Sequence, residues 1–355
     1  MVATNEVPAA FWACLQVCDI EKLEYTIQNA RDAPFFVSCF ADTCVSIPHT
    51  WMQRPQVTRH SSTSRSTTSE ASSKRLCVRE SVPKKLARER DGGHCVITGD
   101  KPIDTAHIYL SCLIHPSQAS TPTPNFWKML SAFWPAEKIR RWQAEIFRDP
   151  LDPSRPTDAC FNLMCLSPTI HRMWGAGIFA LRPLQYSADM TELEVEWQWQ
   201  PIHDHRPQDL VSLTKLPLSS QGLDSVVAPD GNTYKLVVEH SPAECARVKS
   251  GQKFTFKTSD PGRLPLPSKE LLDLQWHLNR VVAISGAAEP RDEDYEDDNS
   301  DDGLALVSAR RYSTIESWID SSVSMGITHP STPLLHPSSP SLLSGNLEHW
   351  LFSVC

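Results

Sequence analysis

An α+β fold is predicted for the middle and the C-terminal part of this 355-residue chain. Apolar and polar residues alternate from Leu193 to Gln200, as in a strand with one buried face. Further along, Leu271, Leu274 and Leu278 recur at helical spacing behind a capping residue, Ser268. Hydrophobic residues make up only 40% of the sequence, so part of the chain is expected to remain unpacked.

The first 52 residues contain short apolar runs without a clear period. They predict a helix over about residues 8–25 and a strand over about residues 35–40, and no role is assigned to them. Residues 53–82 are rich in Ser, Thr and basic side chains, which cannot bury enough apolar surface to pack. This segment is therefore expected to be a disordered linker.

The central part, residues 83–200, is expected to combine short helices and strands. The expected helices are 84–90, 126–147 with an interruption at Pro135, and 168–174. The expected strands are 94–98, 103–110, 178–184 and 193–200. An α+β extension follows over residues 201–290, with a hairpin at Asp230-Gly231, a strand over 253–257 and a helix from Ser268 to Gly286.

Charge is distributed unevenly along the chain, although the formal net charge is −8. Residues 53–90 hold ten Lys and Arg against three Glu, and a basic segment of this kind suits a phosphate backbone. Residues 292–302 hold eight acids and no base. They begin an acidic and Ser/Pro-rich tail, residues 291–355, which is expected to be disordered and to suit a basic protein partner.

Two function classes are excluded by the sequence pattern. No run of 18 apolar residues occurs, so no transmembrane helix and no membrane partner are expected. The N-terminal residues lack the basic start of a secretory signal. Eleven cysteines without a Cys-x-x-Cys pair favour a reducing, intracellular location, nuclear or cytoplasmic.

Three polar residues stand out by their order and surroundings. His107 lies in an expected strand, Asn162 begins the run Asn-Leu-Met-Cys-Leu, and His171 lies on the short helix nine residues later. Together with Cys-Val-Ile-Thr-Gly from Cys95 and Asp-Thr-Ala-His-Ile from Asp104, this part of the chain resembles the HNH endonuclease family, in the group common among uncharacterised fungal proteins. The resemblance implies a ββα-metal finger within residues 83–200 and a metal-dependent hydrolysis of DNA.

The resemblance also implies roles for individual residues. His107 would be the general base, because an imidazole with a pKa of about 6.5 can take a proton from water at neutral pH. Asn162 would hold the loop of the base through hydrogen bonds to the backbone, and His171 would bind a divalent metal ion. We expect the two imidazoles to meet around this single ion, which could be Mg, Mn, Ni or Zn. Cations close to the finger would contact DNA phosphates: Lys84, Lys85, Arg88, Arg90 and Arg172.

The sequence departs from the family pattern at two positions. Ala106 stands where many members have a metal ligand, and Gly175 stands where a second helical ligand often occurs. Asp104 could replace the first ligand only if its strand is bulged. The second hypothesis is therefore a catalytically impaired protein that keeps the HNH fold and binds nucleic acid or protein.

A third hypothesis is a structural zinc site. Cys95, His107, Cys165 and His171 could converge, since thiolates and imidazoles are the ligands that zinc prefers. A smaller cluster, His203-Asp204-His205, is interpreted as a polar turn after the strand that ends near Gln200.

Overall fold

The computed structural model describes residues 5–52, 82–114, 123–149, 156–229, 231–241 and 244–288, all within one compact unit, residues 1–289. The expected linker, apart from Val82, and the expected acidic tail lie outside these residues. None of the described helices combines the length and the apolar character needed to cross a membrane.

The N-terminal region is helical. Its elements are β1 (Glu6–Pro8), α1 (Ala9–Val17), α2 (Ile20–Asp32), α3 (Pro34–Thr43) and α4 (Ser46–Trp51). The strand expected over residues 35–40 is wrong, because α3 occupies this stretch. Pro34 fixes a helical φ at the first position of α3, and packing against α2 then outweighs the β-propensity of Phe35, Phe36 and Val37.

The middle of the chain contains short elements joined by turns. They are α5 (Val82–Arg90), β2 (Asp104–His107), α6 (Ser111–Ile114), α7 (Thr123–Leu130), α8 (Ala136–Ile146), the 3₁₀ helix η1 (Cys160–Asn162), β3 (Leu163–Leu166) and α9 (Pro168–Gly175). The interruption at Pro135 is confirmed, since this proline separates α7 from α8. The strand expected over residues 94–98 is wrong: the backbone N–H of Gly99 donates to the carbonyl oxygen of Cys95 and closes a turn there.

The C-terminal part supplies most of the β-structure. It contains β4 (Phe179–Tyr186), β5 (Glu192–Trp199), β6 (Leu210–Ser212), β7 (Ser225–Val227), β8 (Thr233–Lys235), β9 (Val237–Ser241), β10 (Glu244–Arg247), β11 (Lys253–Lys257) and the long helix α10 (Lys269–Ile284). All pairings among these strands are antiparallel, and β11, β5 and β4 form a three-stranded sheet. The expected hairpin is present as the β7–β8 pair.

The alternation in β5 is confirmed. Leu193, Val195, Trp197 and Trp199 are fully buried. The intervening glutamates lie on the wet face, where Glu194 and Glu192 pair with Lys253 and Lys257 of β11. The sheet therefore has one face in the core and one face covered by cross-strand ion pairs.

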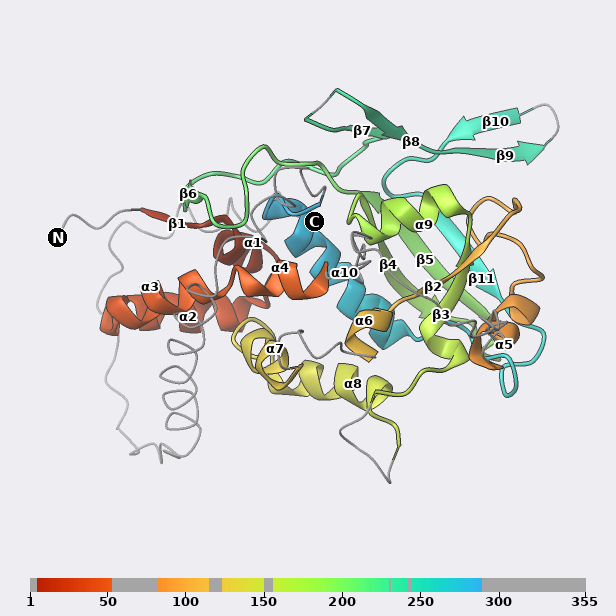
Figure 1. Cartoon of the computed structure of the whole chain (residues 1–355), viewed down its shortest axis with the longest axis horizontal. Coiled ribbons are helices and arrows are strands. Elements are labelled where there is room, and N and C mark those ends of the chain that lie inside the picture. The colour runs from red at the N-terminus through yellow and green to blue at the C-terminus, as the bar shows by residue number, and fades with distance from the viewer. Residues whose placement is uncertain are drawn as a thin grey trace, which may run out of the picture. The chain divides into compact units, whose positions relative to one another are not determined.

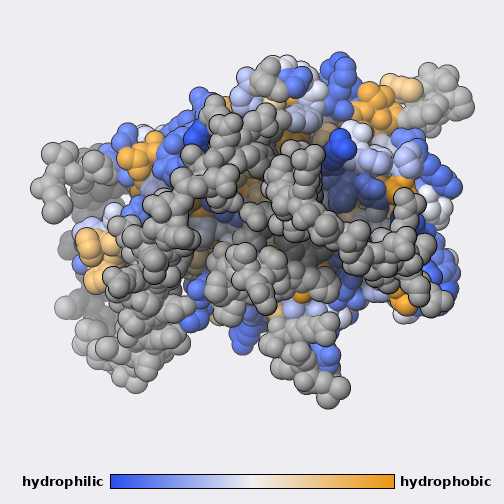
Figure 2. All heavy atoms as spheres, in the orientation of Figure 1, coloured by the Kyte–Doolittle hydropathy of each residue, from blue (hydrophilic) through white to orange (hydrophobic). Residues whose placement is uncertain are grey.

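Helix α10 connects the sheet to the N-terminal helices. It contacts both β4 and α1, and Figure 1 shows it in blue between the red helices and the green strands. The side chain of Ser268 accepts a hydrogen bond from the backbone N–H of Leu271, as expected of an N-cap. One hydrophobic core runs from Ala9 to Ala288. On the face seen in Figure 2, the apolar residues that are visible between the grey atoms form small separate patches. The α+β class predicted from sequence is confirmed.

Candidate functional site: a ββα finger

The ββα finger consists of β2, β3 and α9. The two strands pair antiparallel, with Asp104 opposite Leu166 and His107 opposite Leu163. Helix α9 begins two residues after β3 ends, with Pro168 at its first position, so it starts beside the Asp104 end of β2. The finger therefore brings residues of α9 close to the beginning of β2.

The first polar contact of the finger joins α9 to β2. Nδ1 of His171 lies 3.1 Å from Oδ2 of Asp104. Both side chains are accessible, with 39% of His171 and 48% of Asp104 exposed. Asp104 reaches this position from a β2 ladder that pairs without a bulge, so the condition expected from sequence is not needed.

The second polar contact lies at the other end of β2. Nε2 of His107 lies 3.3 Å from Oδ1 of Asp158, a residue for which the sequence suggested no role. The two side chains are less accessible than the first pair, with 13% of His107 and 25% of Asp158 exposed. Since a strand rises about 3.3 Å per residue, the Cα atoms of Asp104 and His107 are roughly 10 Å apart.

Asn162 fastens the backbone that follows His107. Its Oδ1 accepts a hydrogen bond from the backbone N–H of Tyr109 (2.7 Å), and its Nδ2 donates to the carbonyl oxygen of Tyr109 (3.0 Å). Its own carbonyl oxygen accepts from the backbone N–H of Ile108 (2.8 Å). These are the side-chain to backbone contacts that the resemblance implied, and the catalytic consequence stays a prediction.

The Asp104–His171 pair fits part of a divalent metal site. Two neighbouring ligands of an octahedral ion, each about 2.1 Å from the metal, lie about 3 Å apart, as Oδ2 and Nδ1 do here. Within the described part of the chain, however, no three His, Cys, Asp or Glu side chains converge in a way that could hold a metal ion. His107 does not complete a three-residue ligand set with Asp104 and His171, so the expectation that both imidazoles surround one ion is corrected.

The two departures from the family pattern have different structural consequences. Ala106 lies in β2 and is fully buried, so a ligand side chain at this position would displace core packing. Gly175 ends α9, and a Cβ built there meets no atom within 4 Å. The residues present thus fit a hard ion that keeps most of its ligands as water or phosphate oxygens, as Mg²⁺ commonly does.

A closed structural zinc site does not fit the thiols. The four residues proposed for it, Cys95, His107, Cys165 and His171, form no group of three ligands among the residues described. Burial, with a contribution from Asp91, raises the pKa of the Cys165 thiol to about 12, whereas zinc binds the thiolate.

Four of the five cations expected to contact DNA lie at or near the surface. Lys85, Arg88 and Arg172 are exposed and Lys84 is half-buried. Nε of Arg88 donates to the hydroxyl of Thr105 (3.3 Å), which places this cation beside β2.

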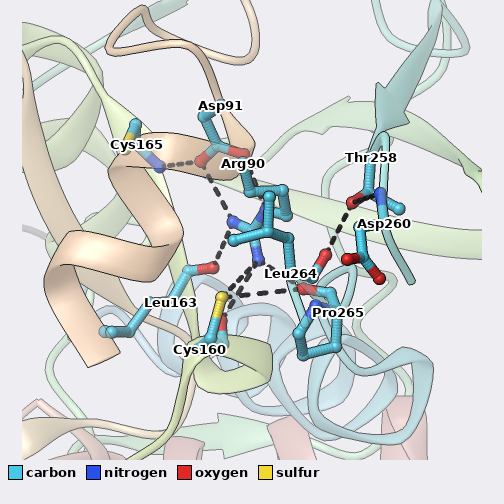
Figure 3. A network of polar contacts seen from close by, with 9 residues as sticks. All are labelled: Arg90, Asp91, Cys160, Leu163, Cys165, Thr258, Asp260, Leu264 and Pro265. Carbon is cyan, nitrogen blue, oxygen red and sulfur yellow. Dashed lines mark hydrogen bonds and ion pairs between the residues drawn. The ribbon is translucent and has the colours of Figure 1, made fainter. Parts of the chain in front are cut away.

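Arg90 is the exception, and its assignment to DNA is corrected. Its guanidinium is fully buried and pairs with Asp91 at 2.7 Å. The same group donates to three backbone carbonyl oxygens, those of Cys160, Leu163 and Pro265 (Figure 3). Burial alone would lower the pKa of Arg90, but the hydrogen bond and the charge of Asp91 outweigh it and raise the pKa. Arg90 therefore fastens α5 to η1, to β3 and to the loop before α10.

Comparison with known proteins agrees with this geometry. Residues 95–182 match the family model described as HNH endonuclease (HNH_2), about a quarter of the chain. This match confirms the resemblance to the HNH endonuclease family over this part of the chain. The family implies a nuclease-type, nucleic-acid-binding domain and, in general, the use of a divalent metal. No curated protein and no solved structure gives a significant match.

Proposed function

We propose that the HNH domain is a metal-dependent endonuclease that hydrolyses phosphodiester bonds in DNA. The observation that carries the proposal is the presence of two imidazole–carboxylate pairs at the two ends of one short strand, Asp104–His171 and His107–Asp158. One pair is accessible and suits a metal ion, and the other is more enclosed and suits proton transfer.

Asp104 and His171 would hold the ion. Their oxygen and nitrogen atoms lie at the separation of two adjacent ligands, and their exposure leaves room for water and for a phosphate. A bound divalent ion would stabilise the charge that develops on the phosphate oxygens.

His107 would act as the general base. A phosphorus atom flanked on one side by a base-held water and on the other by a metal ion needs roughly 8–10 Å between base and metal. The rise of β2 between Asp104 and His107 is of the same size, roughly 10 Å. Residues three apart in a strand project to opposite faces, so one phosphodiester would contact both pairs across the free edge of β2, which pairs with β3 alone among the described strands.

The surrounding cations would hold the DNA. Arg88 lies beside β2 through its contact with Thr105, and Arg172 follows His171 on α9. Lys84 and Lys85 extend the same positive character along α5. Phosphate contacts of this kind position DNA without reading its sequence, so we propose no sequence preference.

The experiment is a nicking assay on supercoiled plasmid with Mg²⁺, Mn²⁺, Ni²⁺ or Zn²⁺. We expect the wild-type protein to nick the plasmid with at least one metal. Asp104→Asn and His171→Ala should each need at least about tenfold more metal for half-maximal rate, because each removes one of two protein ligands. Asp204→Asn is the matched control, since Asp204 is also an exposed carboxylate next to a histidine, His205. Equal metal requirements for all four proteins would contradict the proposed metal site.

A second candidate function is DNA binding without cleavage. It is favoured because the proposed metal site has two protein ligands and lacks a third: Ala106 is buried and apolar, and Gly175 has no side chain. A protein of this kind would shift DNA in a gel in the presence of a chelator and would leave plasmid intact with all four metals. Arg88→Met should then weaken binding at every sequence tested and reduce its salt dependence.

A further inference from the structure

We propose that Asp158 is a positioning residue for His107, an inference that rests on the proposed nuclease function. Its carboxylate would accept the Nε2–H of the neutral imidazole, which leaves Nδ1 as the atom that takes the proton from water. The juxtaposition that carries this inference is the 3.3 Å contact between Oδ1 of Asp158 and Nε2 of His107.

Asp158 comes from a segment that already holds the loop of the base. Four residues after Asp158, Asn162 binds the backbone of Tyr109 on both its N–H and its carbonyl group. The backbone N–H of Ile108 donates to the carbonyl oxygen of Asn162. The segment 158–162 thus contacts the side chain of His107 and the backbone of Ile108 and Tyr109.

The segment itself is anchored on both sides of Asp158. The backbone N–H of Thr157 donates to the carbonyl oxygen of Ile146 at the end of α8 (2.7 Å). On the other side, η1 is held by the buried guanidinium of Arg90, which donates to the carbonyl oxygen of Cys160 (3.1 Å). The backbone is therefore held on both sides of Asp158, so that its carboxylate can restrict the orientation of the His107 imidazole.

A carboxylate on one ring nitrogen determines which nitrogen is basic. In a neutral imidazole one nitrogen carries the proton and the other accepts, and a fixed acceptor keeps the proton on the nitrogen it faces. The 3.3 Å separation is that of an ion pair without the alignment of a hydrogen bond, and catalytic contacts are commonly long or poorly aligned before substrate binds.

The proposed step transfers one proton and exchanges one bond at phosphorus. The oxygen of water forms a bond to phosphorus while its proton moves to Nδ1 of His107. The bond from phosphorus to the leaving sugar oxygen breaks, and its electron pair stays on that oxygen, which takes a proton from solvent. Asp158 keeps its negative charge and stabilises the imidazolium that results.

The test compares Asp158→Ala with Asp158→Asn in the full chain. We expect Asp158→Ala to lower kcat for plasmid nicking by about 10- to 100-fold with KM changed less than twofold, because the contact orients the base and does not touch DNA. Asp158→Asn, which keeps an acceptor oxygen of the same size, should lie between Asp158→Ala and the wild type. A kcat for Asp158→Ala equal to that of the wild type would overturn the positioning role while the nuclease function stands.

A second readout needs no catalysis. Nitrogen-15 NMR of the His107 ring at neutral pH should show the proton on Nε2 in the wild type and a mixture of tautomers in Asp158→Ala. The same tautomer in both proteins would overturn the inference even if activity falls. A wild-type protein that cuts no plasmid with any of the four metals would instead refute the proposed function, a different result from either of these.

Discussion

Replacing Arg90 by methionine separates a structural cation from the cations proposed to bind DNA. The guanidinium of Arg90 is buried and donates to Asp91 and to three carbonyl oxygens. Arg90→Met would keep much of the side-chain volume but leave the buried Asp91 carboxylate without its cation. Breaking a buried ion pair on one side costs about 3–5 kcal/mol, so we expect the free energy of unfolding to fall by this amount.

The assay is urea unfolding followed by tryptophan fluorescence, with Arg88→Met as the matched control on the same helix. Because Arg88 is exposed, its replacement should change the free energy of unfolding by no more than about 0.5 kcal/mol and should weaken DNA binding instead. The structural assignment would be refuted if Arg90→Met had the wild-type midpoint of urea unfolding and lost DNA affinity as Arg88→Met does.

Three further predictions concern single residues. Gly175→His adds a side chain one turn after the proposed ligand His171 in α9, where a Cβ has free space. The affinity for Mn²⁺ in titration calorimetry should therefore rise at least about tenfold, whereas the control Gly175→Ala should leave it unchanged. An unchanged affinity in Gly175→His would show that the metal does not bind beside His171. Burial holds the pKa of folded His203 at about 4, below the ordinary 6.5, so the unfolded chain binds more protons between these values. The free energy of unfolding of the wild type should therefore fall by about 3 kcal/mol as the pH drops through this window. Urea unfolding at several pH values measures this dependence, and His203→Asn should lose it. The same dependence on pH in His203→Asn as in the wild type would contradict the prediction. Gly286→Ala puts a Cβ 1.7 Å from the carbonyl oxygen of His205. The control Gly222→Ala has the same positive φ but no such clash, so Gly286→Ala should lose at least about 2 kcal/mol more of the free energy of unfolding in thermal denaturation. Equal losses would show that the backbone at His205 moves away without cost.

Helical and strand periodicity predicted the regular parts of this fold. The alternation of β5 and the leucine spacing of α10 reflect one-sided burial, which a sequence displays directly. The apolar run at Phe35 shows no such pattern, because a short apolar stretch is compatible with a helix and with a strand alike. Pro34, which starts a helix, and the packing of α3 on α2 determine the helical outcome. The run from Cys95 is ambiguous for the same reason, and a turn closed by Gly99 forms there instead of the expected strand.

The site divides in the same way. Asn162 could be placed from its position before β3 and from the family resemblance, since its contacts are with the backbone two residues after His107. Asp158 lies in an irregular segment 51 residues beyond His107 (158 − 107), and no period marks it. Arg90 carries a signal in the sequence: it lies four residues after Leu86 and three after Ala87, so helical spacing places it on the apolar face of α5, whereas Arg88 lies off this face.

The single-turnover rate of plasmid nicking by His107→Ala at saturating metal tests whether His107 is the general base. General-base catalysis contributes about 10²–10⁴-fold, so we predict a loss of this size with the metal requirement unchanged, because the proposed ligands are Asp104 and His171. Nicking by His107→Ala at the wild-type rate would show that His107 is not the general base.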